Sequence, residues 1–162
     1  MTSSDKVAAR MRDVLSRICE KELTVATAES CTGGLVAALM TDIEGCSHAF
    51  DRGFVTYTDD AKRELLGVED ALLRDKGAVS EEVAINMAEQ ALERSAADIA
   101  VSVTGYAGSS GGEGKEGLVH FGLARSGAET MHRMEQFGAR GRDVIRQMCL
   151  ETVVEMIEES LE

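Results

Sequence analysis

Apolar side chains recur at intervals of three and four residues in several segments of the chain, which is the pattern of helices that bury one face. The predicted helices span residues 5–20, 35–43, 80–92 and 142–161, with a shorter one from residue 58 to 67. Thr58 and Ser80 are each followed by two acids, the signature of a capped helix start. Residues 68–79 are expected to form a helical turn and a loop.

Short runs of β-branched and aliphatic residues lie between these helices and predict strands. They span residues 24–27, 51–57, 98–104 and 118–124, and a weaker alternation over 130–137 indicates an edge strand. The last two runs are close enough to form an antiparallel hairpin. Helices and strands alternate along the rest of the chain. The pattern therefore predicts one α/β domain over residues 1–162, a three-layer α/β/α sandwich on a mixed, mostly parallel sheet.

Composition narrows the possible partners. The chain has 162 residues, and aromatic residues are only 4% of them, so the core must be largely aliphatic. The formal net charge is −12, and the chain has no compensating basic cluster. Such a surface repels nucleic acid and anionic membranes, so neither is expected as a partner. No apolar run approaches membrane-spanning length, and the amino terminus lacks a signal-peptide pattern, so we expect a cytoplasmic protein.

Polar residues follow the ends of three predicted strands, where open α/β sheets bind their ligands. The three groups are residues 29–34, Tyr57 and Thr58 with Lys62, and Thr104 with Gly105. Residues 29–34 lead into a helix whose free N–H groups would attract an anion, and the paired glycines allow close approach. A strand-end hydroxyl with an early-helix lysine suggests serine chemistry assisted by a lysine base. This chemistry requires a lysine pKa lowered by burial or by a nearby cation.

Other site types are less well supported. The four cysteines have spacings that match no zinc pattern, and no metal is predicted. His120 and His132 lie within predicted strands, and the chain contains no G-x-S-x-G elbow, so a Ser-His-Asp triad is disfavoured. Cys46 lies in a polar turn and is kept as an alternative nucleophile.

Four motifs, in this order, resemble the CinA carboxy-terminal family of competence/damage-inducible proteins. They are AESCTGG at 28–34, RGFVTY at 52–57 with Lys62, GAVS at 77–80 and VTGYAG at 103–108. The stand-alone form of that family is a nicotinamide-nucleotide amidohydrolase. The resemblance implies hydrolysis of the carboxamide of nicotinamide mononucleotide, giving nicotinate mononucleotide and ammonia. It implies a small-molecule nucleotide substrate, a serine–lysine mechanism and no cofactor.

The resemblance also implies roles for individual residues. The nucleophile would be Ser47, after Gly45 and Cys46, with Lys62 as its base and Tyr57 between them to hold or relay the proton. Thr104 would contact the substrate amide or the oxyanion, and Arg142 the phosphate or ribose. The remaining residues expected to line the substrate site are Ser30, Thr32, Gly33, Gly34 and Gly105.

Several alternatives stay open. Ser30 is the more obvious nucleophile from local pattern alone, and its other role would be a helix cap. Tyr57 could instead be a sheet aromatic, Lys62 a solvated helix residue and Arg142 a surface arginine. An acid such as Glu29 near the substrate would suit the positive pyridinium ring. A non-catalytic nucleotide-binding module or a competence/damage-related regulatory module is the alternative function, and we expect self-association into a homo-oligomer.

Overall fold

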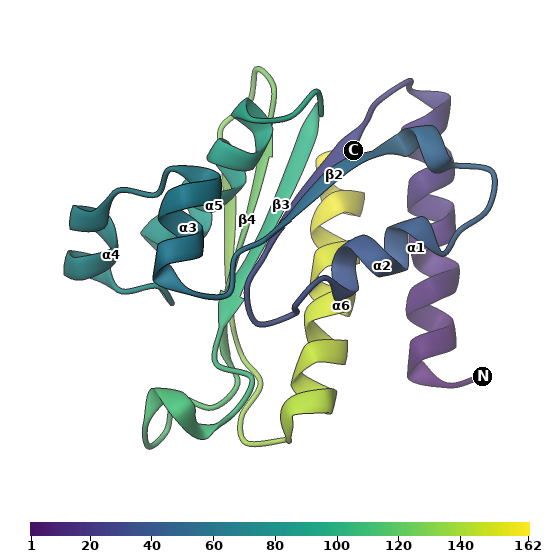
Figure 1. Cartoon of the computed structure of the whole chain (residues 1–162). Helices are drawn as coiled ribbons and strands as arrows, with labels where there is room; N and C mark the ends of the chain where they lie inside the picture. The colour runs from purple at the N-terminus through teal and green to yellow at the C-terminus, as the bar shows by residue number, and fades with distance from the viewer.

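A computed structural model describes the backbone of residues 1–162 and all side chains except that of Ser110. Five strands form one sheet in the order β2-β1-β3-β4-β5 (Figure 1). Their bounds are Val25–Glu29 (β1), Phe50–Val55 (β2), Ile99–Gly105 (β3), Leu118–Arg125 (β4) and Met131–Gln136 (β5). β1 pairs in parallel with β2 and β3, whereas β4 is antiparallel to both of its neighbours. The sheet is therefore mixed, and β4 alone runs against the other strands.

Helices cover both faces of this sheet and complete the predicted three layers (Figure 1). One face carries α1 (Ser3–Glu20), α2 (Leu35–Thr41) and α6 (Arg142–Ser160); the other carries α3 (Asp59–Leu66), α4 (Asp70–Lys76) and α5 (Glu81–Glu93). The segment expected as a helical turn and loop thus contains α4. Two short 3-10 helices, η1 (Ser47–Ala49) and η2 (Ser109–Gly111), lie in connections. None of the helices described has the length and apolar content needed to cross a membrane.

The two faces of the sheet carry side chains of different size. Val25, Val101 and Val103 belong to the larger core on the side of α1 and α6, whereas Ala26 and neighbouring small residues belong to the core under α5. Small side chains let α5 approach closely: a Cβ on Gly122 would lie 2.5 Å from the Ala84 carbonyl oxygen. The close packing of α5 fixes its amino end, and with it the preceding residues, near the ends of the strands.

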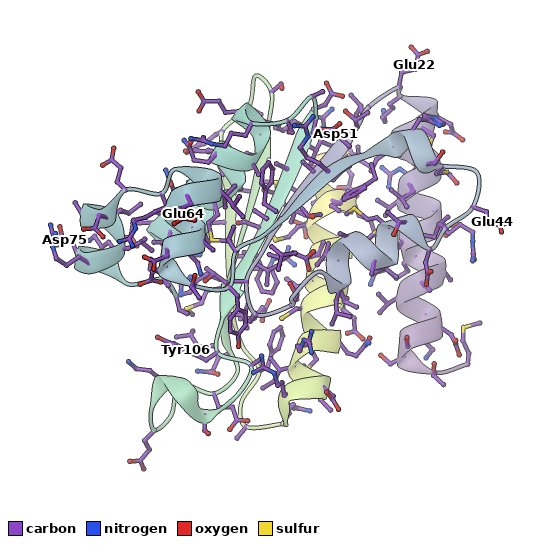
Figure 2. All side chains as sticks on the ribbon, in the orientation of Figure 1. Glu22, Glu44, Asp51, Glu64, Asp75 and Tyr106 are labelled. Carbon is purple, nitrogen blue, oxygen red and sulfur yellow. The ribbon has the colours of Figure 1, made fainter. Side chains whose placement is uncertain are left out.

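The carboxyl ends of β1, β2 and β3 meet at one edge of the sheet. The Thr56 amide donates to the Glu29 carbonyl oxygen at 2.8 Å, and the Ser30 amide donates to the Val103 carbonyl oxygen at 2.9 Å. These bonds hold the segments that leave the three strands side by side. In Figure 2, Tyr106 follows β3 at this edge, and Asp51 marks the opposite edge, near the start of β2.

Candidate functional site

A pocket of about 200 Å³ opens where the three parallel strands end. Its walls come from six parts of the chain: residues 30–31, Tyr57, α3, residues 78–79, residues 104–107 and the start of α6. This is the edge at which ligands bind in open α/β sheets. The pocket therefore contains residues from all three of the strand-end groups that the sequence singles out.

Lys62 lies at the base of this pocket and is unusually buried for a lysine, with 1% of its surface exposed. Its Nζ donates hydrogen bonds to Ser30 Oγ at 3.1 Å and to the Thr56 carbonyl oxygen at 3.0 Å. The position of Lys62 is set by α3, whose first turn is capped by Thr58 Oγ1, which accepts from the Ala61 amide at 3.0 Å. The structure thus pairs Lys62 with Ser30.

The environment of Lys62 disfavours its charged form. Burial lowers the pKa of Lys62, and the negative charges of Asp59 and Cys31 oppose this effect in part. A lysine amine can take a proton from a serine only if its pKa is lowered in this way. The hydrogen bond to Ser30 and the lowered pKa together give the pair the properties of a nucleophile and its base.

The structure does not bring Ser47 to this pocket. Ser47 is exposed and lies in η1, directly before the amino end of β2, whereas Ser30 follows the carboxyl end of β1. Because β1 and β2 are parallel, the two serines lie at opposite edges of the sheet, separated by roughly the 17 Å length of a five-residue strand. The expected pairing of Ser47 with Lys62 across Tyr57 is therefore not the arrangement that the structure shows, and neighbouring Cys46 lies at the same distant edge.

The amino terminus of α2, expected to receive a ligand anion, is occupied by a carboxylate of the protein itself. Glu29 is 1% exposed, and its oxygens accept from the amides of Val36 at 2.8 Å and Ala37 at 3.1 Å, and from Thr32 Oγ1 at 2.7 Å. The negative carboxylate fits the positive end of the helix. This corrects two expectations: Glu29 is not part of the pocket wall, and the N–H groups at the start of α2 already donate to a carboxylate of the protein.

Thr32, Gly33 and Gly34 belong to this internal arrangement and are not part of the pocket wall. Gly33 and Gly34 have φ values of +58° and +102°, which side chains rarely adopt, so they form the tight turn into α2. A Cβ on Gly33 would lie 3.2 Å from Arg146 Nη2, which itself donates to the Thr32 carbonyl oxygen. We therefore assign these three residues to the shape of the turn that presents Ser30.

Replacing Glu29 with glutamine is expected to destabilise the fold by about 1–3 kcal/mol, because its NH₂ takes the place of one of the two acceptor oxygens and would face a backbone N–H group that the carboxylate now satisfies. Urea denaturation measures the change in the free energy of unfolding. Glu44→Gln, at an exposed site in the connection after α2, is the matched control with the same change of charge. Equal stability of the two variants would contradict this role for Glu29.

Tyr57 and Arg142 form the rim of the pocket. Arg142 is the first residue of α6, and its Nη2 donates to the Tyr57 hydroxyl oxygen at 3.0 Å. Tyr57 is 59% exposed, so its ring borders the opening and does not belong to the core of the sheet. Both residues lie in the pocket wall. This is the place expected for Arg142 as a substrate-binding residue, whereas Tyr57, expected to hold or relay a proton between Ser47 and Lys62, is turned toward Arg142.

Thr104 and Gly105 end β3 inside the pocket. Thr104 is 1% exposed, and its hydroxyl donates to the Ala78 carbonyl oxygen at 2.8 Å, which ties residues 78–79 to the pocket wall. A Cβ on Gly105 would lie 2.8 Å from the Leu118 carbonyl oxygen, so only glycine allows β4 this close. The motif at residues 77–80 therefore contributes to the pocket wall, a role that was not predicted from the sequence.

Sequence reasoning gave no site role to one polar residue of the pocket wall, Asp59, and it included Cys31 only as part of the group at residues 29–34. Asp59 had a detectable signal, because it precedes Lys62 by three residues on one predicted helix and so shares its face. Cys31 is 4% exposed. Contact with the Cys149 thiol and the positive charges of Arg142 and Arg146 lower the pKa of Cys31. The polar stretch at residues 29–34 does not by itself indicate this burial.

The histidines are engaged elsewhere in the sheet. His120 and His132 lie on the adjacent strands β4 and β5, and His120 Nδ1 is 2.9 Å from His132 Nε2. Neither residue belongs to the pocket wall around Ser30. The buried, hydrogen-bonded pair of ionisable or nucleophilic side chains inside the pocket is thus Ser30 with Lys62.

The fold and the site define an α/β protein with a serine–lysine pair in a strand-end pocket. The chain belongs to the family of the CinA C-terminal domain, whose family model matches residues 7–161. The crystal structure of the competence/damage inducible protein CihA from Agrobacterium tumefaciens superposes with a TM-score of 0.91 at 43% identity, covering 96% of this chain and 94% of that one.

Two curated relatives differ in length. A CinA-like protein of Akkermansia muciniphila is 47% identical over 143 residues, which are 87% of this chain but 34% of that protein. The nicotinamide-nucleotide amidohydrolase PncC of Escherichia coli K12 is 48% identical over 128 residues, which are 78% of this chain and 77% of that protein. This chain therefore spans about a third of the length of the CinA-like relative and most of the length of the amidohydrolase.

Proposed function

We propose that residues 1–162 act as a single amidohydrolase domain that converts nicotinamide mononucleotide to nicotinate mononucleotide and ammonia. The observation that carries the proposal is the 3.1 Å hydrogen bond between Lys62 Nζ and Ser30 Oγ inside the strand-end pocket. The name of the Escherichia coli relative, with its 48% identity, supports the choice of substrate. The cytoplasmic location and the self-association expected from the sequence stay predictions.

In the proposed mechanism Ser30 is the nucleophile. Neutral Lys62 takes the Ser30 hydroxyl proton as Oγ bonds to the carboxamide carbon, giving a tetrahedral oxyanion. When the C–N bond breaks, the Lys62 ammonium returns that proton to the leaving amine, and ammonia departs. Lys62, neutral again, then activates a water molecule that hydrolyses the Ser30 ester to the carboxylate. Lys62 passes the proton taken from that water to Ser30 Oγ as the ester bond breaks, so the Ser30 hydroxyl and the neutral amine are both restored and no cofactor is needed.

The pocket wall supplies the remaining roles. Arg142 at the rim provides the positive charge for the phosphate, and the Tyr57 ring beside it provides a surface for the ribose or the base. Thr104 holds residues 78–79 in the wall and stands at the end of β3, where the carboxamide would lie. Gly105, beside Thr104 in the pocket wall, lets β4 pack closely against this strand end.

Incubation of the purified protein with nicotinamide mononucleotide tests the proposal. We expect ammonia and nicotinate mononucleotide to be released in equal amounts. Enzyme-coupled detection measures the ammonia, and chromatography measures the nucleotide product. Nicotinamide riboside is the substrate control and should react more slowly, because it has no phosphate for Arg142 to bind. Binding without ammonia release would overturn the enzymatic proposal and favour a non-catalytic nucleotide-binding module.

A further inference from the structure

Asp59 brings a negative charge to the pocket beside the proposed base. Among the pocket-wall residues that the structure describes, it is the one carboxylate. Asp59 is the first residue of α3 and precedes Lys62 by three positions, so the two side chains share one face of the helix. Among the neighbouring charges, that of Asp59 has the largest effect on the pKa of Lys62, which it raises.

The neighbouring acid, Asp60, faces a different environment. Asp60 forms an ion pair with Arg63, which also donates to Asp70 Oδ1 at 2.6 Å. Asp59 takes part in none of the ion pairs found among the described side chains, and it is exposed to solvent at the pocket. Two carboxylates of α3, adjacent in sequence, thus differ in whether their charge is already paired within the protein.

The proposed substrate carries opposite charges at its two ends, a pyridinium ring and a phosphate. Arg142 suits the phosphate, but the ring must approach Lys62, whose protonated form would repel it. A carboxylate beside Lys62 offsets this repulsion. Glu29 cannot serve here, because its oxygens accept three hydrogen bonds at the start of α2.

We infer that Asp59 is a specificity-determining residue that selects ligands with a cationic ring over ligands with a neutral one. The inference rests on the proposed function, since it concerns how the same pocket receives nicotinamide mononucleotide. In this arrangement Asp59 and Arg142 form a pair of opposite charges that matches the two ends of the ligand. The Asp59 carboxylate attracts the ring equally in the ground state and in the transition state, so it changes the affinity for the ligand.

Calorimetric titration of the wild type and of Asp59→Asn, with two ligands, tests the inference without requiring turnover. The ligands are nicotinamide mononucleotide and its reduced form, in which the dihydropyridine ring carries no charge. We expect Asp59→Asn to weaken binding of the cationic ligand by about five- to tenfold at low salt and to leave the reduced ligand within about twofold. Asp60→Asn, with the same change of net charge, is the matched control and should bind both ligands as the wild type does.

A pH profile gives a second readout. The titratable groups in the pocket wall besides Asp59 are Cys31, Tyr57, Lys62, Tyr106 and Arg142. Removing the Asp59 carboxylate removes a charge that raises the pKa of Lys62, so that pKa falls further in Asp59→Asn. The rise of kcat/KM with pH should therefore move to lower pH in this variant and stay in place in Asp60→Asn.

The outcomes separate the inference from the proposed function. Ammonia release by the wild type, with equal weakening of both ligands in Asp59→Asn, would overturn the role of Asp59 and leave the activity standing. Selective weakening of the cationic ligand in a protein that releases no ammonia would support Asp59 and overturn the activity. Equal effects of Asp59→Asn and Asp60→Asn, or no binding of either ligand to the wild type, would also overturn the inference.

Discussion

Replacing Ser30 with alanine is expected to lower kcat for ammonia release by at least about a thousandfold, because the variant lacks the oxygen that attacks the carboxamide. The Lys62 side chain loses one of its two hydrogen-bond partners but keeps the Thr56 carbonyl oxygen. Ligand binding should change little, since Arg142 and Tyr57 at the rim are untouched. Steady-state kinetics with coupled ammonia detection measures the first effect, and calorimetric titration measures the second.

Ser47→Ala is the matched control for this experiment. Ser47 is exposed at the opposite edge of the sheet, so its loss should leave kcat within about twofold of the wild type. Loss of activity in Ser47→Ala with activity retained in Ser30→Ala would reverse the assignment of the nucleophile. It would then require a rearrangement that brings η1 to Lys62.

The secondary structure and the layers were predictable because the apolar pattern is strong. Helices α1, α5 and α6 each bury a continuous stripe, and β3 is a run of small and β-branched residues that ends in glycine. Helix α4 was only partly foreseen because it has seven residues, of which Leu73 alone is buried. A helix this short draws its stability from its neighbours, and the segment itself carries little signal.

The location of the pocket was predictable, but the partners within it were only partly so. Strand ends with polar residues indicated the correct edge of the sheet, and the local pattern favoured Ser30. The resemblance instead pointed to Ser47, although the strand predicted over residues 51–57 lies between Ser47 and Lys62 and separates them by about one strand length. Once the parallel register of β1 and β2 is known, the choice follows.

The case of Glu29 shows how alternation along a strand decides between two roles. Val25, Thr27 and Glu29 occupy every second position of β1, so they share one face of the sheet, and Val25 belongs to the core on the side of α1 and α6. Glu29 therefore faces α2 and caps it. Ser30 lies beyond the last residue of the strand, where the chain turns and strand alternation ends, so its contact with Lys62 required the structure.

Replacing Lys62 with methionine, which has a similar shape and no charge, is expected to abolish ammonia release to the same extent as Ser30→Ala while the fold is retained. Both groups belong to one proton-transfer unit, so the double variant should be no less active than either single variant. Kinetics of the three variants with nicotinamide mononucleotide measures this. Ammonia release by Lys62→Met within tenfold of the wild type would contradict the role of Lys62 as base.

The same variant changes how stability depends on pH, and the sign follows from burial. The pKa of Lys62 is lowered in the folded protein from its ordinary value of 10.5, so between the two values the unfolded chain binds more protons than the native one. The free energy of unfolding of the wild type therefore rises with pH in that window, and below it the cost of burying the ammonium is present in full. Lys62→Met lacks this cost.

Urea denaturation at a series of pH values from 7 up to the ordinary lysine pKa of 10.5 should accordingly show the wild type gaining stability relative to Lys62→Met as the pH rises. Lys76→Met, at an exposed position of α4, is the control and should differ from the wild type by the same amount throughout this series. A stability difference between wild type and Lys62→Met that does not change with pH would mean that Lys62 keeps an ordinary pKa. The protein would then lack the neutral amine that the proposed mechanism needs. Catalysis and the pH-dependent cost in stability both depend on the same buried group, Lys62.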